Sequence, residues 1–198
     1  NGPQPFAVAV NVPGISNATN DLDFDGVDDD IDDCLGLFGT STLDRQGCPD
    51  SDGDGYSDDD VDWTVAEGAD AFPSDSSQWA DNDQDGYGDE STGTDPDACI
   101  LVSGTSITDR LGCPDTDADG YSDPDGGWSV ADGADSCFGV SGTSDGDRNG
   151  CPDGDGDGYS DPDPSGVNGP IWNIADGADA WESDSTQWVD SDGEGYGD

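Results

Sequence analysis

Hydrophobic and polar residues follow neither a helical nor a strand period over most of this 198-residue chain. The one strand-like run is Phe6 to Val12, and a polar tract around Ser16 to Asn20 follows it. Beyond this tract no helical apolar period persists, and 31 Gly and 12 Pro interrupt the chain. No apolar run approaches the ~20 residues of a membrane span. The pattern predicts an irregular fold with little regular secondary structure.

The polar positions are ordered by a repeated acidic motif instead. The pattern Asp-x-Asp-x-Asp/Glu-Gly occurs six times, and its starts are about 29 to 38 residues apart, which is typical of a repeat array. The copies begin at Asp21, Asp50, Asp81, Asp115, Asp153 and Asp190. We therefore expect a strand-like or linker segment over residues 1–20 and an array of six repeats over residues 21–198, the last of them incomplete.

The charge balance excludes several classes of function. The chain carries 49 Asp and Glu against 3 Lys and Arg, with no His, a formal net charge of −46 and 30% hydrophobic residues. Such a composition is typical of disorder unless a cation neutralises the carboxylates. Three Arg cannot form the basic patch that nucleic acids or anionic membranes require. Because there is no His, no Lys and no nucleophile with a base, we do not expect an enzyme.

Each acidic motif has the spacing of a calcium loop. Side chains at positions 1, 3 and 5 would face one ion, Gly at position 6 permits the tight turn, and the carbonyl of position 7 points inward. The first copy fills the twelve-residue pattern, whereas the other five have Tyr at position 7 and Asp at position 9. In the later loops we infer that an Asp two residues before a Cys or an aromatic residue closes the loop, after insertions of different length. The predicted metal ligands are Asp21, Asp23, Asp25, Val27, Asp29 and Asp32; Asp50, Asp52, Asp54, Tyr56, Asp58 and Asp70; Asp81, Asp83, Asp85, Tyr87, Asp89 and Asp97; Asp115, Asp117, Asp119, Tyr121, Asp123 and Asp135; Asp153, Asp155, Asp157, Tyr159, Asp161 and Asp179; and Asp190, Asp192, Glu194, Tyr196 and Asp198.

Several calcium ions are the cofactor that this pattern predicts. Magnesium keeps much of its water and favours sparser octahedral sites, and zinc would need His or a Cys-x-x-Cys pair. The alternative is a flexible acidic linker that binds ions weakly. A linker would not require the fixed aromatic and cysteine positions that accompany the loops.

The connectors between loops are of two kinds. Three share the pattern Cys-x4-Gly-Thr-Ser-x2-Asp-Arg-x-Gly-Cys-Pro-Asp, which contains all six cysteines and all three Arg. The cysteine pairs are Cys34 and Cys48, Cys99 and Cys113, and Cys137 and Cys151. Six cysteines allow 15 connectivities, but the threefold repetition favours three local disulfides and hence an oxidising, extracellular compartment. A metal–thiolate site is the alternative.

The Arg residues and the aromatic residues of the connectors suggest structural roles. Arg45, Arg110 and Arg148 occupy equivalent positions, and we expect each to clamp its own connector by bonding carboxylates or carbonyls; partner binding is the alternative. In the second kind of connector, Phe72 to Trp79 and Trp181 to Trp188, aromatic residues replace the cysteines. We expect these to form small local cores, with carbohydrate stacking as the alternative.

The acidic loops with their Cys and Trp positions resemble the thrombospondin type 3 repeat, in the form found in bacterial and archaeal surface proteins. The resemblance covers residues 21–198 and implies an irregular, elongated rod of disulfide-stapled loops wrapped around calcium ions. It also implies more than one ion in a loop. The plausible ligands for second ions are Asp60, Glu67, Asp125, Asp132, Asp163 and Asp176.

These features favour an extracellular calcium-binding structural protein, secreted or at a cell surface, that serves as a stalk, spacer or filament subunit. The alternatives are a calcium-dependent adhesive module that binds glycans or surface proteins, and the non-catalytic part of a larger secreted enzyme. The partners would be neighbouring domains, or a neighbouring subunit on which Phe6 to Val12 docks head to tail. Asn17 lies in a glycosylation sequon. Because the chain lacks an initiator Met, we expect residue 1 to be a processed end or the start of an excised segment.

Overall fold

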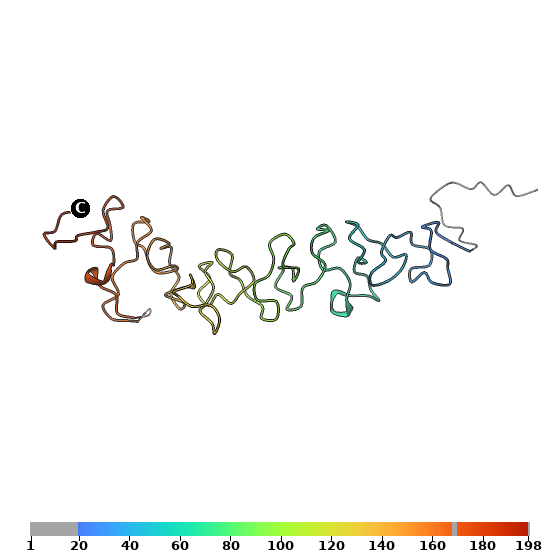
Figure 1. The fold of residues 1–198 in the computed structure, drawn as a ribbon, viewed down its shortest axis with the longest axis horizontal. Helices are drawn as coiled ribbons and strands as arrows, with labels where there is room; N and C mark the ends of the chain where they lie inside the picture. The colour runs from blue at the N-terminus through green and yellow to red at the C-terminus, as the bar shows by residue number, and fades with distance from the viewer. Residues whose placement is uncertain (1–19, 168–169, 198) are drawn as a thin grey trace, which may run out of the picture. The chain divides into compact units, whose positions relative to one another are not determined.

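This computed structural model describes residues 20–167 and 170–197 (Figure 1). The expected strand over residues 6–12 and the sequon at Asn17 lie outside the described residues. The chain divides into two compact units, of which the first ends at Ala80 and the second begins at Asp81. The boundary follows the first aromatic connector, so the first unit contains loops 1 and 2 and the second contains loops 3 to 6.

Regular secondary structure is sparse, as the sequence predicted. Within residues 20–167 and 170–197 the helices are two single 3-10 turns, η1 (Val65–Glu67) and η2 (Ile174–Asp176), and pairing is limited to three isolated β-bridges. Each 3-10 turn follows a Trp of an insertion and ends at a Gly with φ of 117°. No helix in the described part of the chain is long and apolar enough to cross a membrane.

The side chains that the fold buries are small or polar. The buried hydrophobic residues are four cysteines and three alanines. They are Cys48, Ala69, Cys113, Ala134, Cys137, Cys151 and Ala178. Serines and aspartates are also buried, and large apolar residues such as Val61 are exposed. Area burial of such residues contributes little, so covalent links, hydrogen bonds and charge neutralisation must hold the described loops together.

The three predicted disulfides are present. Cys34–Cys48, Cys99–Cys113 and Cys137–Cys151 each join residues 14 apart in sequence, and no described cysteine is free. A closed loop of about 15 residues contributes ~3 kcal/mol by restricting the unfolded chain. The irregular, disulfide-stapled repeat array predicted from the sequence is therefore confirmed.

Each disulfide connector is bonded to the loop that follows it. The amides of Thr42 and Leu43 donate to the carbonyl of Gly55, at position 6 of the second loop. The equivalent amides of the other two connectors donate to Gly120 and Gly158. Because the same contact recurs three times, each connector and the loop after it form one structural step.

The Arg side chains reach beyond their own connectors. Arg45 forms an ion pair with Asp60 at 2.9 Å, and Arg110 forms one with Asp125 at 2.7 Å. Each guanidinium also lies over a Trp of the following insertion, for example Arg45 over Trp63 at 5.5 Å. Arg110 also donates to Cys99 Sγ of its own connector at 3.2 Å, so this Arg both bonds within its connector, as expected, and links the connector to the next insertion.

Candidate metal centres

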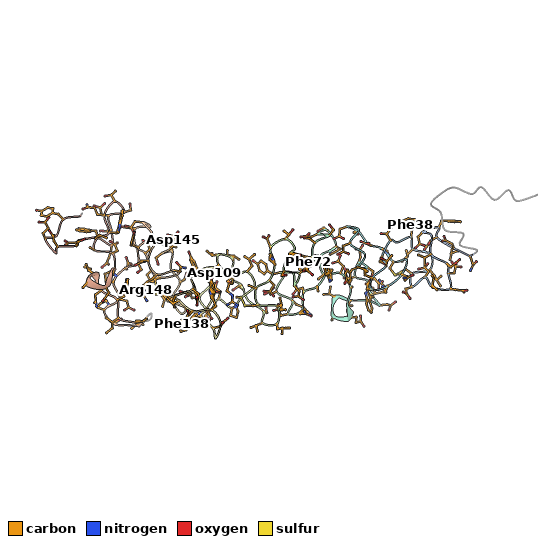
Figure 2. The ribbon with its side chains drawn as sticks, in the orientation of Figure 1. Phe38, Phe72, Asp109, Phe138, Asp145 and Arg148 are labelled. Atoms are coloured by element: carbon orange, nitrogen blue, oxygen red, sulfur yellow. A yellow bond between two sulfur atoms is a disulfide. The ribbon has the colours of Figure 1, made fainter. Side chains whose placement is uncertain are left out.

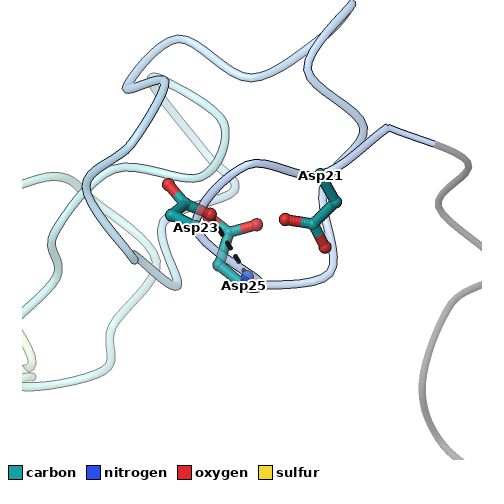
Figure 3. A group of neighbouring side chains, drawn as sticks. All are labelled: Asp21, Asp23 and Asp25. Carbon is teal, nitrogen blue, oxygen red and sulfur yellow. Dashed lines mark hydrogen bonds between the residues drawn. The ribbon is translucent and has the colours of Figure 1, made fainter.

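Five of the six acidic motifs bring three carboxylates together. In each, the Asp residues at positions 1, 3 and 5 offer oxygen atoms that all lie within 4.8 Å of one another. Figure 3 shows the first of these triads, Asp21, Asp23 and Asp25, whose carboxylates converge inside one turn of the chain. The other triads begin at Asp50, Asp81, Asp115 and Asp153.

Two left-handed residues bend the chain around each triad. Gly at position 6 has φ between 84° and 102° in all six copies, as the turn requires. Position 4 is also left-handed: Phe24, Gln84 and Ala118 have φ of 67°, 64° and 63°. The position-1 carboxylate holds both residues in place, since Asp115 accepts the amides of Ala118 at 2.8 Å and Gly120 at 2.9 Å. The other three copies have Gly at position 4, but the need for a left-handed backbone at this position was not recognised from the sequence.

The inferred closing aspartates occupy one equivalent place in five loops. In each loop the amide of the closing Asp donates to the carbonyl of position 8, at 2.8–3.0 Å. The bonds are Asp32 to Asp28, Asp70 to Ser57, Asp97 to Gly88, Asp135 to Ser122 and Asp179 to Ser160. The insertions before the closing Asp therefore leave the loop itself unchanged.

The closing carboxylates are held with one oxygen free. In Asp135, which is 0% exposed, Oδ1 accepts the amide of Cys137 at 2.6 Å, while Oδ2 is buried without a hydrogen-bond partner. Asp70, Asp97 and Asp179 repeat this arrangement, with Oδ1 bound to the amide two residues later and Oδ2 without a partner. A buried anionic oxygen without a partner is costly, so a cation is the group that fits.

The electrostatics place each closing carboxylate beside the other acids of its loop. Burial, together with the charges of Asp119, Asp117 and Asp123, raises the pKa of Asp135 to about 7, although its hydrogen bond from the amide of Cys137 acts in the opposite direction. Burial likewise raises the pKa of Asp70 to about 7 and that of Asp97 to about 6, with the same loop positions contributing. Carboxyls that resist ionisation beside other carboxylates are expected where a metal ion normally supplies positive charge.

Glycine forms one wall of three sites. A Cβ on Gly112 would lie 2.3 Å from an oxygen of Asp97 and 3.0 Å from an oxygen of Asp85. Gly47 and Gly150 stand in the same relation to the first and fourth loops. Each of these glycines precedes the second cysteine of a disulfide. The disulfide therefore holds the backbone of the glycine against both the closing carboxylate and the position-5 carboxylate.

The remaining predicted ligands, the position-9 carboxylates and the position-7 carbonyls, differ in whether they accept hydrogen bonds. Position 9 is bonded to position 2; Asp123, for example, accepts the amide and hydroxyl of Thr116 at 3.1 Å and 2.6 Å. The position-7 carbonyls of Val27 and of Tyr56, Tyr87, Tyr121 and Tyr159 accept none of the described backbone hydrogen bonds. Positions 1, 3 and 5, the closing Asp and the position-7 carbonyl thus form an all-oxygen donor set, which suits a calcium ion.

The sixth motif differs from the others. Asp190, Asp192 and Glu194 do not belong to the triads that the described residues bring together, although Asp190 accepts the amides of Gly193 and Gly195 as in the other loops. Asp198 lies outside the described residues. Tyr196 is 74% exposed.

The residues that the family resemblance suggested for second ions have other partners. Asp60 and Asp125 bind Arg45 and Arg110. Glu67 bonds to Thr64, Asp132 to Ser129, Asp176 to Asn173, and Asp163 to Ser165. In the described structure these carboxylates stabilise the insertions, and none belongs to a triad.

One repeated structural group escaped the sequence reasoning. The Asp before each Arg accepts the buried Ser at position 8 of the next loop; Asp109 accepts Ser122 Oγ at 2.6 Å and the indole of Trp128 at 3.1 Å. Burial opposes ionisation of Asp109, but these hydrogen bonds lower its pKa. Asp44 and Asp147 bind Ser57 and Ser160 in the same way (Asp109 and Arg148 are labelled in Figure 2). The Asp-Arg pair repeated in each connector was the available signal.

The aromatic connectors pack against the position-7 tyrosines. Tyr56 stacks on Trp79 and Tyr159 on Trp188, in both cases with ring centroids 5.1 Å apart. The amide of Ala71 donates to Trp79, as the amide of Asp33 donates to Gln46 in the first disulfide connector. The aromatic residues thus hold the chain in the place where a disulfide holds it elsewhere.

Comparison with known proteins adds no assignment. No protein-family model matches the chain, and no curated protein matches it significantly.

Proposed function

We propose that this chain is a calcium-dependent structural protein of the extracellular space, built from repeats like those of thrombospondin type 3. The observation that carries the proposal is the buried closing carboxylate, present in four loops with one oxygen that lacks a hydrogen-bond partner. Each of these carboxylates lies beside a triad of further carboxylates. In its ionised form such a group is favourable in a folded protein when a cation neutralises it.

Calcium suits the donor set better than other ions do. Each of the first five loops offers four carboxylates and one carbonyl, and calcium takes six to eight oxygen ligands in flexible geometry. Zinc would favour nitrogen and sulfur, but the chain has no His and its six cysteines are all in disulfides. Calcium bound at the five triads would supply charge that offsets part of the formal −46.

Folding and ion binding would then be one event. The described chain buries mainly cysteine, alanine, serine and aspartate, so apolar burial cannot offset the repulsion between carboxylates within each loop. The disulfides support an oxidising, extracellular setting. A stalk, spacer or filament subunit is the role that suits an array in which each disulfide connector binds the following loop.

A calcium titration with ion counting tests the proposal. In chelator the chain is expected to expand and to lose its near-UV aromatic signal, and calcium should restore both. Native mass spectrometry should then find at least five ions. The variant Asp70→Asn should lose one ion, while Asp62→Asn, which removes the same charge at an exposed position of the same unit, should lose none. A hydrodynamic radius that does not respond to chelator would refute the proposal.

A saccharide-binding role is the second candidate, and one observation favours it. Trp188 is 38% exposed, while its ring is fixed by Tyr159 and adjoins a hollow of about 340 Å³ lined by Ile174, Ala178 and Asp190 among others. An exposed indole beside polar groups suits the stacking of a sugar ring. Glycan-array binding that is lost in Trp188→Ala but kept in Trp181→Ala would support this role, and no binding by the calcium-loaded chain would exclude it.

A further inference from the structure

The first loop carries an apolar face that the other loops lack. Leu22 and Phe24, at positions 2 and 4, are 65% and 83% exposed. The other loops have only polar or small residues at these two positions. They are Ser51, Asn82, Thr116, Gly154 and Ser191 at position 2, and Gly53, Gln84, Ala118, Gly156 and Gly193 at position 4.

The adjoining connector extends this face. Leu35, Leu37 and Phe38 are 56%, 61% and 61% exposed. The amide of Gly36 donates to Asp23 at 3.1 Å, and a Cβ on Gly36 would lie 3.6 Å from Leu22, so the two segments lie side by side. We call Leu22, Phe24, Leu35, Leu37 and Phe38 the first-loop apolar face (Phe38 is labelled in Figure 2).

The apolar residue at position 2 replaces a polar function. In the second, third and fourth loops the position-2 side chain donates to the position-9 carboxylate, as Ser51 does to Asp58 at 2.6 Å. Leu22 cannot, and Asn20, which precedes the loop, donates to Asp29 instead. The first loop therefore takes this hydrogen bond from a residue outside the loop and presents apolar surface at position 2, which indicates that something covers this surface.

We propose that residues 6–12 of the same chain cover the first-loop apolar face. Phe6, Val8, Val10 and Val12 alternate with smaller or polar residues, so in an extended chain they would share one side. Residues 1–20 contain no Asp, Glu, Lys or Arg, in a chain of net charge −46. This stretch can therefore approach an acidic loop without repulsion and offers the apolar side chains that the face lacks.

The length of the intervening chain allows the contact. The carbonyl of Asn20 accepts the amide of Asp29 at 2.8 Å, so the chain enters the first loop beside Leu22. Seven residues lie between Val12 and Asn20, and the eight residue steps span at most about 28 Å. Pro13-Gly14 is a sequence that favours a turn.

The same chain is a better occupant than a neighbouring copy. A short tether holds the segment at an effective concentration in the millimolar range, above that of a second molecule in a micromolar solution. A second molecule would also bring its own negative charge close to the first. The head-to-tail contact expected from the sequence is the alternative that the experiments below distinguish from this contact within one chain.

Hydrogen exchange of the calcium-loaded full chain tests this inference. The double variant Val8→Asp/Val10→Asp should raise the exchange rate of amides in residues 22–38 about tenfold. The matched variant Ala7→Asp/Asn11→Asp adds the same charge on the other side of the segment and should change the rate less than twofold. Equal exchange in both variants and the parent chain, or an equal rise in both variants, would overturn the inference. Protection that disappears between 100 µM and 1 µM protein would assign the face to a second copy instead.

A cross-link gives a measurement that does not depend on destabilising the chain. With a photoreactive benzoylphenylalanine in place of Val8, the cross-linked peptides should map to residues 22–38 in a product of monomer mass. Cross-links to other regions, or a product of dimer mass, would refute the contact. Ion counting on the same sample separates this result from the calcium proposal, because loss of the contact between residues 6–12 and the first-loop apolar face should leave the triads and their ions intact.

Discussion

Replacing Asp135 by Asn should change the stability of the metal-free and the calcium-loaded chain in opposite directions. Asp135 is 0% exposed, its Oδ1 accepts the amide of Cys137, and its Oδ2 is buried without a partner. Asn has the same shape and keeps an oxygen for Cys137. Its amide nitrogen can donate to the neighbouring carboxylates of Asp119 and Asp117, whose charges raise the pKa of Asp135. What the substitution removes is one negative charge that faces the proposed ion.

The magnitude follows from the pKa of Asp135. Burial and its acidic neighbours raise this pKa from 3.8 to about 7. Each tenfold change in the ionisation constant corresponds to 1.36 kcal/mol, so the ionised form costs the metal-free fold about 4 kcal/mol at most. A carboxyl whose pKa is raised on folding stabilises the fold below pH 3.8, and this stability is lost as the pH rises to about 7. In chelator at pH 7.5, Asp135→Asn should therefore stabilise the fold by up to about 4 kcal/mol, and the gain should vanish near pH 3.8.

With calcium the sign should reverse, because the ion loses a charged ligand. The assay in calcium is urea unfolding followed by Trp fluorescence, together with a calcium titration. In chelator, where the chain is expected to expand, the assay is the hydrodynamic radius at pH 7.5 and pH 4, which Asp135→Asn should reduce at pH 7.5. Asp145→Asn is the matched control, because it removes a charge at an exposed position in the same unit (Figure 2). If Asp135→Asn expanded the chain further in chelator, or left the calcium affinity unchanged, the reasoning about the closing carboxylate would be wrong.

Three further predictions concern the turns, the disulfides and pH. Ala118→Gly should stabilise the chain by about 1 kcal/mol, because Ala118 at position 4 has a left-handed φ of 63°. Gly156→Ala, at the same position with φ of 81°, should destabilise the chain by a similar amount. Urea unfolding midpoints of the two calcium-loaded variants test both signs. Replacing Cys99 and Cys113 by Ser should lower the stability by about 3 kcal/mol and weaken one calcium site. Native mass spectrometry should then show the loss of a single ion, and an unchanged unfolding midpoint would contradict the prediction. In chelator, acidification from pH 7.5 to pH 4 should contract the chain, because protonation removes the charge of carboxyls such as Asp70, whose pKa is about 7; a hydrodynamic radius that stays constant or grows would oppose this explanation.

The repeats could be recognised from the sequence because their signals are local. The spacing of Asp at positions 1, 3 and 5 and the Gly at position 6 specify a turn within six residues, and the structure brings five such triads together. The disulfides follow from a separation of 14 residues repeated three times. The closing Asp residues were found through a short motif next to Cys or an aromatic residue, even though the insertions before them differ in length.

What the sequence by itself determined is therefore the repeat, its triads, its disulfides and the shortage of regular secondary structure, all of which depend on residues close together in the chain. Only the tertiary structure decided where the longer side chains go. Arg45 reaches Asp60 and Trp63 in the next insertion, Asp109 binds a buried Ser 13 residues later, and Leu22 lies beside Gly36. These contacts depend on how one loop is placed against the next, and no local spacing encodes that placement, because it arises from backbone hydrogen bonds between connector and loop.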